Sequence, residues 1–315
     1  MISKILLLLQ CFDRRKMLKN KKLIGIAGLI LASFFWGAEF VVEKDVLSSV
    51  SPNYSNAIRF AIASMICTVF FIHQIKKMTL EDLTNGCITG GFMGFGFAFQ
   101  TMGLNTINAG ENALLCSSYI LMIPFAQWIF LKKKPGMNTF VCATIALTGV
   151  FLISSNGNIA EFSFSIGEIY TLIGAIFYSG AIITISRLSL KTDSRLLTLL
   201  QLYIIAVISI IFAILLEKAP TQFTASLVVE FIYLILFATI GAQILMNLCI
   251  KYVTSSTAGM IFSTEAFFAT VLGVIILKEV TGLALWIGTF LIIGSIIFIQ
   301  IEEDRKTISA ASNSY

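Results

Sequence analysis

The sequence is poor in charged residues. Asp, Glu, Lys and Arg make up only 12% of its 315 residues, whereas 57% are hydrophobic. Soluble domains average about 25% charged and about 45–50% apolar residues, so this composition excludes an ordinary soluble protein. The mean hydropathy of +0.91 agrees. The composition predicts an integral membrane protein.

Histidine is nearly absent, and cysteine shows no useful pattern. The single histidine, His73, cannot build a metal site alone, and its place at the end of an apolar run predicts an interfacial position. The six cysteines have no paired spacing, which indicates free thiols in helix packing. No strand precedes the glycine-rich segment 90–96 and no Gly-Lys-Ser/Thr follows it, so ATP hydrolysis is not expected. We expect neither a metal nor a cofactor.

Long apolar runs fill most of the chain instead. A helix needs roughly 20 apolar residues to cross a bilayer, at about 1.5 Å per residue. The runs are too long and too continuously apolar for the alternating pattern of a membrane barrel. We therefore predict an all-α fold with about ten transmembrane helices, over 22–43, 54–74, 85–105, 110–131, 137–154, 167–186, 196–216, 227–250, 255–277 and 281–301.

The Lys and Arg residues between these spans predict the orientation. If the spans alternate, the basic residues at 76–77, 132–134, 187–195 and 251 fall on one side, together with both basic termini. The opposite side holds only Lys44, Lys218 and Lys278. By the positive-inside rule this predicts a multi-pass protein of the cytoplasmic (inner) membrane with both termini in the cytoplasm. The net charge of +5 thus reflects topology and gives no reason to expect nucleic acid as a partner.

The two ends of the chain differ from the apolar body. Residues 1–21 are predicted to be a cytoplasmic N-terminal extension, and the second methionine, Met17, suggests a misassigned start or a dispensable segment. Residues 302–315 are polar and Ser-rich, which predicts a disordered cytoplasmic tail.

The two halves of the chain resemble each other. Phe35-Trp36-Gly37-Ala38 is similar to Tyr178-Ser179-Gly180-Ala181, and residues 108–113 are similar to 254–259 at nearly the same offset. This divides the chain into five-helix repeats over 22–154 and 167–301. Because five is odd, the second copy would enter the membrane from the opposite side, which predicts an inverted repeat.

Several motifs, in order along the chain, resemble one known family. They are the Trp-Gly segment 33–45, the Arg-Phe segment 57–63, residues 97–104, residues 123–125 with 132–135, and residues 263–269 followed by Lys278 and Glu279. Together they are similar to the EamA-type ten-helix branch of the drug/metabolite transporter superfamily, over about residues 20–302. The family usually has Pro after the glutamate of its ninth helix, where this chain has Ala266.

The resemblance implies a secondary transporter that exports a small metabolite, such as an amino acid or a similar amphipathic compound, by alternating access. The expected partners are that small molecule, protons and the lipid bilayer, and the oligomeric state is not predicted. A lipid or lipid-linked-sugar flippase and uncoupled uptake remain alternatives. An intramembrane enzyme would need a nucleophile, a base or metal ligands near an interface, and one histidine without clustered acids argues against it.

Glu265 is the foremost candidate for function. It lies near the middle of an apolar run, where a charged side chain costs roughly 2.5–3.5 kcal/mol, so such residues usually face a bundle interior or a wet cavity. Because desolvation favours the neutral carboxyl group, Glu265 is a candidate for proton coupling or for binding a substrate amine. The alternative is a structural glutamate that is hydrogen-bonded between helices.

Trp36, Glu39 and Glu43 share one helical face by their spacing. Glu39 is a candidate contact for a cationic or zwitterionic substrate, with Trp36 offering a cation–π surface. Trp36 is otherwise a packing residue, and Glu43 is expected to be interfacial. Arg59, about two turns into the second span, is predicted to meet a substrate carboxylate or to hold Glu39 in a structural ion pair.

Further polar residues lie in the helices expected around a central cavity. Each is explained as well by interhelical hydrogen bonding, which contributes about 0.6–2 kcal/mol in membranes. We expect some of them to contact substrate: Gln100, Asn112, Tyr119, Gln127, Gln243 and Asn247.

Overall fold

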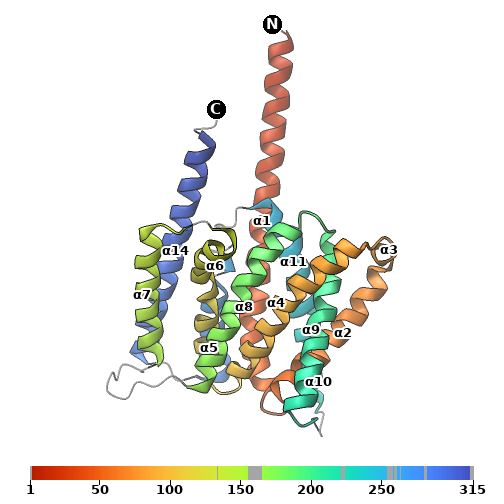
Figure 1. Cartoon of the computed structure of the whole chain (residues 1–315), viewed down its shortest axis with the longest axis vertical. Helices are drawn as coiled ribbons and strands as arrows, with labels where there is room; N and C mark the ends of the chain where they lie inside the picture. The colour runs from red at the N-terminus through yellow and green to blue at the C-terminus, as the bar shows by residue number, and fades with distance from the viewer. Residues whose placement is uncertain are drawn as a thin grey trace.

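All the elements of the described chain are helical in the computed structural model (Figure 1). The structure describes residues 2–132, 134–154, 165–220, 224–253, 258, 261–262, 264–279 and 282–312; for 2–21, 130–131, 154, 299–300 and 303–312 only the backbone is described. The first half contains α1 (Ile2–Val46), α2 (Pro52–Phe70), α3 (Ile72–Ile75), α4 (Leu80–Leu104), α5 (Ala109–Ser117), α6 (Tyr119–Leu131) and α7 (Met137–Ser154).

The helices of the second half have more interruptions. It contains α8 (Ile166–Leu188), α9 (Ser194–Leu216), α10 (Ala225–Tyr233), the π-helix η2 (Leu234–Gly241), α11 (Ala242–Cys249), the 3-10 helix η3 (Ile250–Tyr252), α13 (Thr264–Leu272), the π-helix η4 (Gly273–Leu277) and α14 (Leu283–Ser312).

The predicted spans correspond to these helices with several differences. The span predicted over 54–74 is divided at Phe71 into α2 and α3. The span predicted over 110–131 is divided at Ser118 into α5 and α6, and that over 227–250 is α10, η2 and α11 in succession. The backbone of α14 continues to Ser312, beyond the end of the span predicted at residue 301, and the disorder expected from residue 302 stays a prediction. Much of the start of the span predicted over 255–277 lies outside the described residues, as do most of the repeat residues 254–259.

Only some of the helices are long and apolar enough to cross a membrane. Five described segments meet both conditions: Lys22–Val46, Ala109–Ile129, Ile166–Leu188, Ser194–Leu216 and Ala225–Tyr252, and shorter apolar helices accompany them. α2 and α4 do not, because they carry buried polar residues and glycines where they pack against other helices. Buried polar groups such as Asn56 and Thr101 hydrogen-bond each other there, which lowers hydropathy without exposing polarity to lipid.

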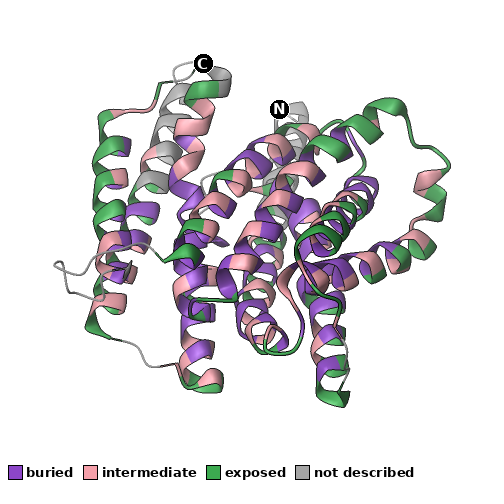
Figure 2. Cartoon of the chain, turned by 60° about the horizontal axis from the view of Figure 1, so that its bottom comes forward, coloured by how far each residue is buried: buried purple, intermediate pink, exposed green. Residues whose placement is uncertain are grey.

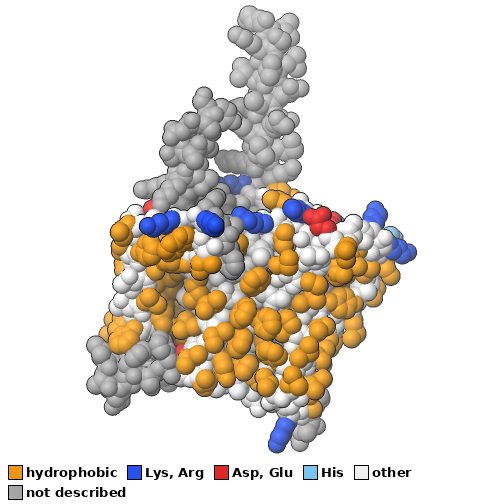
Figure 3. Space-filling model, viewed as in Figure 1, with side chains coloured by type: hydrophobic (Ala, Val, Ile, Leu, Met, Phe, Trp, Pro, Cys, Tyr) orange, Lys and Arg blue, Asp and Glu red, His pale blue; other side chains and the backbone are white. Residues whose placement is uncertain are grey.

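Helices from the two halves interleave in a single bundle. α4 packs against α8 and α9, α2 against α9, and α1 against α11 and α13, while α7 and α14 form a pair at one side (Figure 1). Buried residues face the contacts between helices (Figure 2). Both termini lie at the same end of the bundle (Figure 1). In Figure 3, hydrophobic side chains cover the sides and Lys and Arg side chains gather along the rim nearest the termini.

We call the end of the bundle away from the termini the far end. At this end, two glutamate side chains cap the N-termini of helices. Glu217, which follows α9, accepts hydrogen bonds from the backbone N–H of Asn53 (2.9 Å) and Tyr54 (3.0 Å) at the start of α2. Glu279 accepts from the N–H of Ala109 (2.6 Å) at the start of α5. Each carboxylate compensates the unpaired donors and positive dipole of a helix N-terminus, and both join the second half to the first.

Candidate functional site

A buried ion pair joins α1 to α2. Arg59 Nη1 lies 2.7 Å from Glu39 Oε1, and Arg59 Nε donates to Thr239 Oγ1 of η2. Arg59 is 0% exposed and Glu39 is 4% exposed. Charges so far from water persist only when they are paired and hydrogen-bonded. The ion-pair alternative predicted for Arg59 is therefore the arrangement that the structure shows.

Glu43 belongs to the same cluster. Its carboxylate lies 3.7 Å from Arg59 Nη1 and its side chain is 2% exposed. The expectation that Glu43 is interfacial is wrong, because one helical turn brings it under Glu39 and beside the guanidinium. We call Glu39, Glu43 and Arg59 the charged triad.

Aromatic rings complete the surroundings of the guanidinium. Arg59 Cζ lies 4.9 Å from the ring centroid of Phe60 and 5.4 Å from that of Phe97. Ring faces attract cations, and the attraction grows when water is excluded. The guanidinium is thus held by carboxylates, a hydroxyl and two rings, all within the protein.

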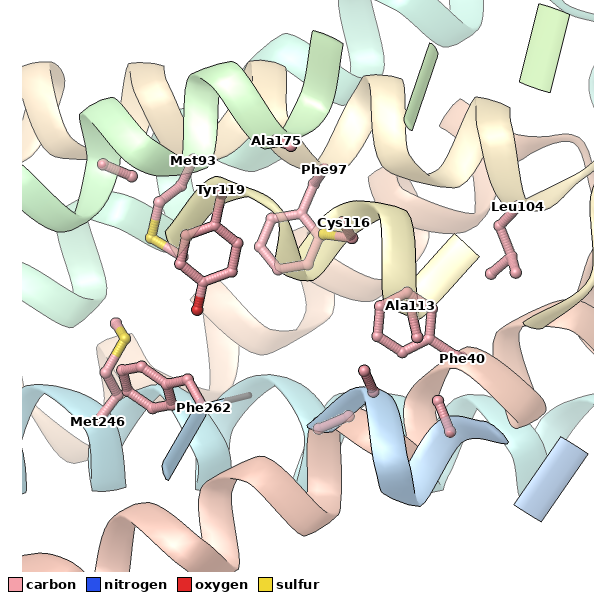
Figure 4. Packing of buried hydrophobic residues seen from close by; sticks show 14 of the residues in the cluster. Phe40, Met93, Phe97, Leu104, Ala113, Cys116, Tyr119, Ala175, Met246 and Phe262 are labelled. Atoms are coloured by element: carbon pink, nitrogen blue, oxygen red, sulfur yellow. The ribbon is translucent and has the colours of Figure 1, made fainter. Parts of the chain in front are cut away.

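A cavity of about 50 Å³ lies beside the triad in the centre of the bundle. Figure 4 shows part of its wall, with the Tyr119 hydroxyl directed toward the side that carries Met246 and Phe262. Its lining comes from both halves of the chain: Trp36, Glu39, Phe40, Met93, Phe97, Gln100, Cys116, Tyr119, Tyr178, Ala181, Ile182, Ile185, Met246, Phe262 and Glu265.

Glu265 lies at the wall of this cavity, in the first turn of α13. Among the described residues no hydrogen bond or ion pair to Glu265 is found, and it is close enough to Glu39 for their charges to interact. Close packing of α13 on α1 sets its position: a Cβ on Gly37 would lie 2.5 Å from Phe268 Cβ and 2.8 Å from the Glu265 carbonyl oxygen. The glycine of the Trp-Gly pair therefore allows the approach that brings Glu265 to the cavity.

Trp36, Gln100 and Tyr119 also reach the cavity, as the sequence predicted for a central site. Trp36 Nε1 donates to the Ala238 carbonyl at 3.0 Å, and its ring lies 5.7 Å from that of Phe262. Gln100 Oε1 accepts from the Tyr178 hydroxyl. These bonds fix the wall while leaving the aromatic faces available to a ligand.

The remaining predicted residues lie between helices and do not line the cavity. Asn112 Nδ2 donates to Thr171 Oγ1 at 2.6 Å. Gln243 and Asn247 both donate to Gln201 Oε1, at 2.9 and 3.1 Å. Gln127, on α6, is likewise outside the lining. The described bonds of Asn112, Gln243 and Asn247 are interhelical, and any contact of the four residues with substrate stays a prediction.

Sequence reasoning missed several lining residues. Tyr178, Phe97, Met93 and Phe262 are apolar or aromatic and look like ordinary packing residues in an apolar chain. For Tyr178 one signal exists, because the internal repeat aligns it with Phe35, next to the cavity residue Trp36.

A polytopic helical bundle with carboxylates at a central cavity is typical of a membrane transport protein. Residues 23–155 and 165–301 each match the EamA-like transporter family. The chain therefore belongs to that family, within the drug/metabolite transporter superfamily, and is a multi-pass membrane protein.

Relatives from several microorganisms agree with this assignment. An uncharacterized transporter of Archaeoglobus fulgidus is 30% identical over 90% of this chain and 87% of its own length. The uncharacterized transporter YrdR of Bacillus subtilis is 26% identical over 93% and 97%. The uncharacterized inner membrane transporter YicL of Salmonella typhimurium is 24% identical over 91% and 98%.

The fold also resembles a crystal structure at a TM-score of 0.64, with 17% identity over 91% of this chain and 98% of that one. At this identity the likeness concerns the fold alone.

Proposed function

We propose that the chain is a secondary transporter that exports a small amphipathic metabolite carrying an amino group across the cytoplasmic membrane. The observation that carries the proposal is the placement of Glu39 and Glu265 on the wall of one largely apolar cavity built by both halves. Carboxylates at such depth are costly, and a transport pathway is the usual reason for their presence. The family resemblance adds amino acids as a cargo class and export as the direction.

Proton antiport through Glu265 is the proposed coupling mechanism. No described ion pair holds Glu265 in its charged form, in contrast to Glu39, so a proton or a cationic cargo has to compensate it. Because the two compete for one carboxylate, binding of cargo releases the proton. Exchange of one for the other links the proton gradient to export.

Topology and alternating access follow from the arrangement of the halves. Both termini and the basic rim lie at one end (Figures 1 and 3), and the positive-inside rule places that end in the cytoplasm. Two family repeats of five helices each would be inverted relative to each other. Rocking of one repeat against the other would then expose the cavity first to one side and then to the other.

The test is the metabolite profile of medium and cytosol in cells that express wild type, Glu265→Gln or Glu81→Gln at equal membrane levels. Glu81 is the matched control, because its carboxylate is 67% exposed and lies away from the cavity. We expect wild type and Glu81→Gln to shift a metabolite to the medium and Glu265→Gln not to. An active Glu265→Gln would contradict the coupling role, and an inactive wild type would contradict export.

A further inference from the structure

All the formal charges among the described residues of the cavity wall are negative. Glu39 and Glu265 line it, and the described lining contains no Lys, Arg or His. The two carboxylates come from different halves of the chain and meet at this one cavity. A ligand that enters this space therefore meets negative charge or none.

The nearest guanidinium is already occupied. Arg59 binds Glu39, lies 3.7 Å from Glu43 and donates to Thr239, and it is 0% exposed. The Phe97 ring, which lies over the guanidinium, is itself part of the cavity wall. With both glutamates ionised the charged triad carries one net negative charge. Arg59 thus has no positive charge to offer the carboxylate of a cargo.

The rest of the wall suits an apolar body with a positive end. Trp36 and Phe262 lie 5.7 Å apart by ring centroids, and Tyr119 and Tyr178 lie 6.1 Å apart. Aromatic faces attract ammonium groups as well as apolar groups. The side chain of Met93 is unbranched and flexible, so this part of the wall can adjust to the shape of a ligand.

We propose that the cargo is an organic amine without a carboxylate group, with its ammonium group held by Glu39 and Glu265 and its apolar body against the aromatic wall. A zwitterionic amino acid would bring its own carboxylate next to two others with no cation to compensate it, and like charges in a desolvated site repel strongly. The inference rests on the proposed function and narrows its substrate class from amphipathic metabolites to cationic amines.

The test uses three compounds that share a phenyl ring and a two-carbon linker. Phenethylamine carries only the ammonium group, phenylalanine carries both charged groups, and 3-phenylpropionate carries only the carboxylate. Binding of each to the purified full-length protein is measured by isothermal titration calorimetry. We expect phenethylamine to bind at least about tenfold more tightly than phenylalanine, and 3-phenylpropionate not to bind.

Three variants locate the effect. Glu265→Gln is expected to weaken phenethylamine binding about tenfold or more, whereas Glu265→Asp, which keeps the charge, should retain the preference for the amine. Glu81→Gln, on the exposed rim, should bind like wild type. Because Glu265→Asp keeps a carboxylate, its result separates loss of charge from loss of folding.

Phenylalanine binding as tightly as phenethylamine would overturn the inference, as would undetectable phenethylamine binding or a Glu265→Gln variant that binds it normally. If one of these binding results is obtained and the metabolite profile shows export of an amino acid, the transporter proposal still holds and only the proposal of an amine cargo is wrong. A wild type that moves no metabolite would instead remove the transporter proposal, whatever binds the cavity.

Discussion

At the scale of single residues, the site depends on which carboxylate is compensated. Arg59 binds Glu39 directly and lies beside Glu43, whereas Glu265 faces the cavity without a described partner. A buried guanidinium favours the charged form of the carboxylate that it binds, whereas a buried carboxylate without a partner has to take up a proton or a cation. The charged triad thus brings a paired carboxylate, Glu39, to the cavity wall, and Glu265 is the group that can change state.

Removal of the guanidinium should therefore cost stability. Arg59→Met leaves two buried carboxylates without their cation, and we expect a loss of about 3–5 kcal/mol in the free energy of unfolding. The measurement is thermal or denaturant unfolding of the purified protein in detergent. Adding Glu39→Gln to Arg59→Met should recover part of the loss, since it removes one uncompensated charge; no recovery would contradict the ion-pair account.

At the scale of elements, the α1–α13 contact positions the cavity carboxylate. Gly37→Ala would push a methyl group against Phe268 and the backbone at Glu265, so the two helices must separate. We expect a loss of about 1–3 kcal/mol in stability and weaker transport. Gly91→Ala is the matched control, because a Cβ there meets nothing within 4 Å. Equal effects of the two substitutions, measured by unfolding and by export, would contradict a specific role for this contact.

The helix caps at the far end should hold that end closed. Glu279→Gln removes the negative charge that compensates the start of α5, and we expect the far end to open more often. Cys116, buried at the cavity wall, reports this opening: its modification by a small thiol reagent should become faster, as measured by mass spectrometry. The control is Asp82→Asn, which removes a capping box at the start of α4, at the other end of the bundle. Unchanged Cys116 modification in Glu279→Gln would contradict the role of the cap.

At the scale of the whole molecule, the sequence predicted the helical membrane class and the two repeats, because composition and internal similarity can be seen without the fold. It also indicated that Glu265 faces the bundle interior, because a charged side chain in contact with lipid is energetically costly. It also placed Glu39 and Trp36 on one face, and both line the cavity. It could not predict that Glu43 joins Arg59, since that depends on how α1 crosses α2. Nor could it predict that Tyr178 lies at the cavity wall and Asn112 between helices, because only the packing of the helices decides which side chains reach the cavity.

The central claim, that Glu265 couples export to protons, is tested most directly in everted membrane vesicles. Uptake of the metabolite exported by cells is measured with and without an imposed pH gradient, acidic inside, for wild type, Glu265→Gln and Glu81→Gln. The account predicts that the gradient drives accumulation in wild type and Glu81→Gln and has no effect in Glu265→Gln. Accumulation in Glu265→Gln that responds to the gradient as wild type does would contradict it.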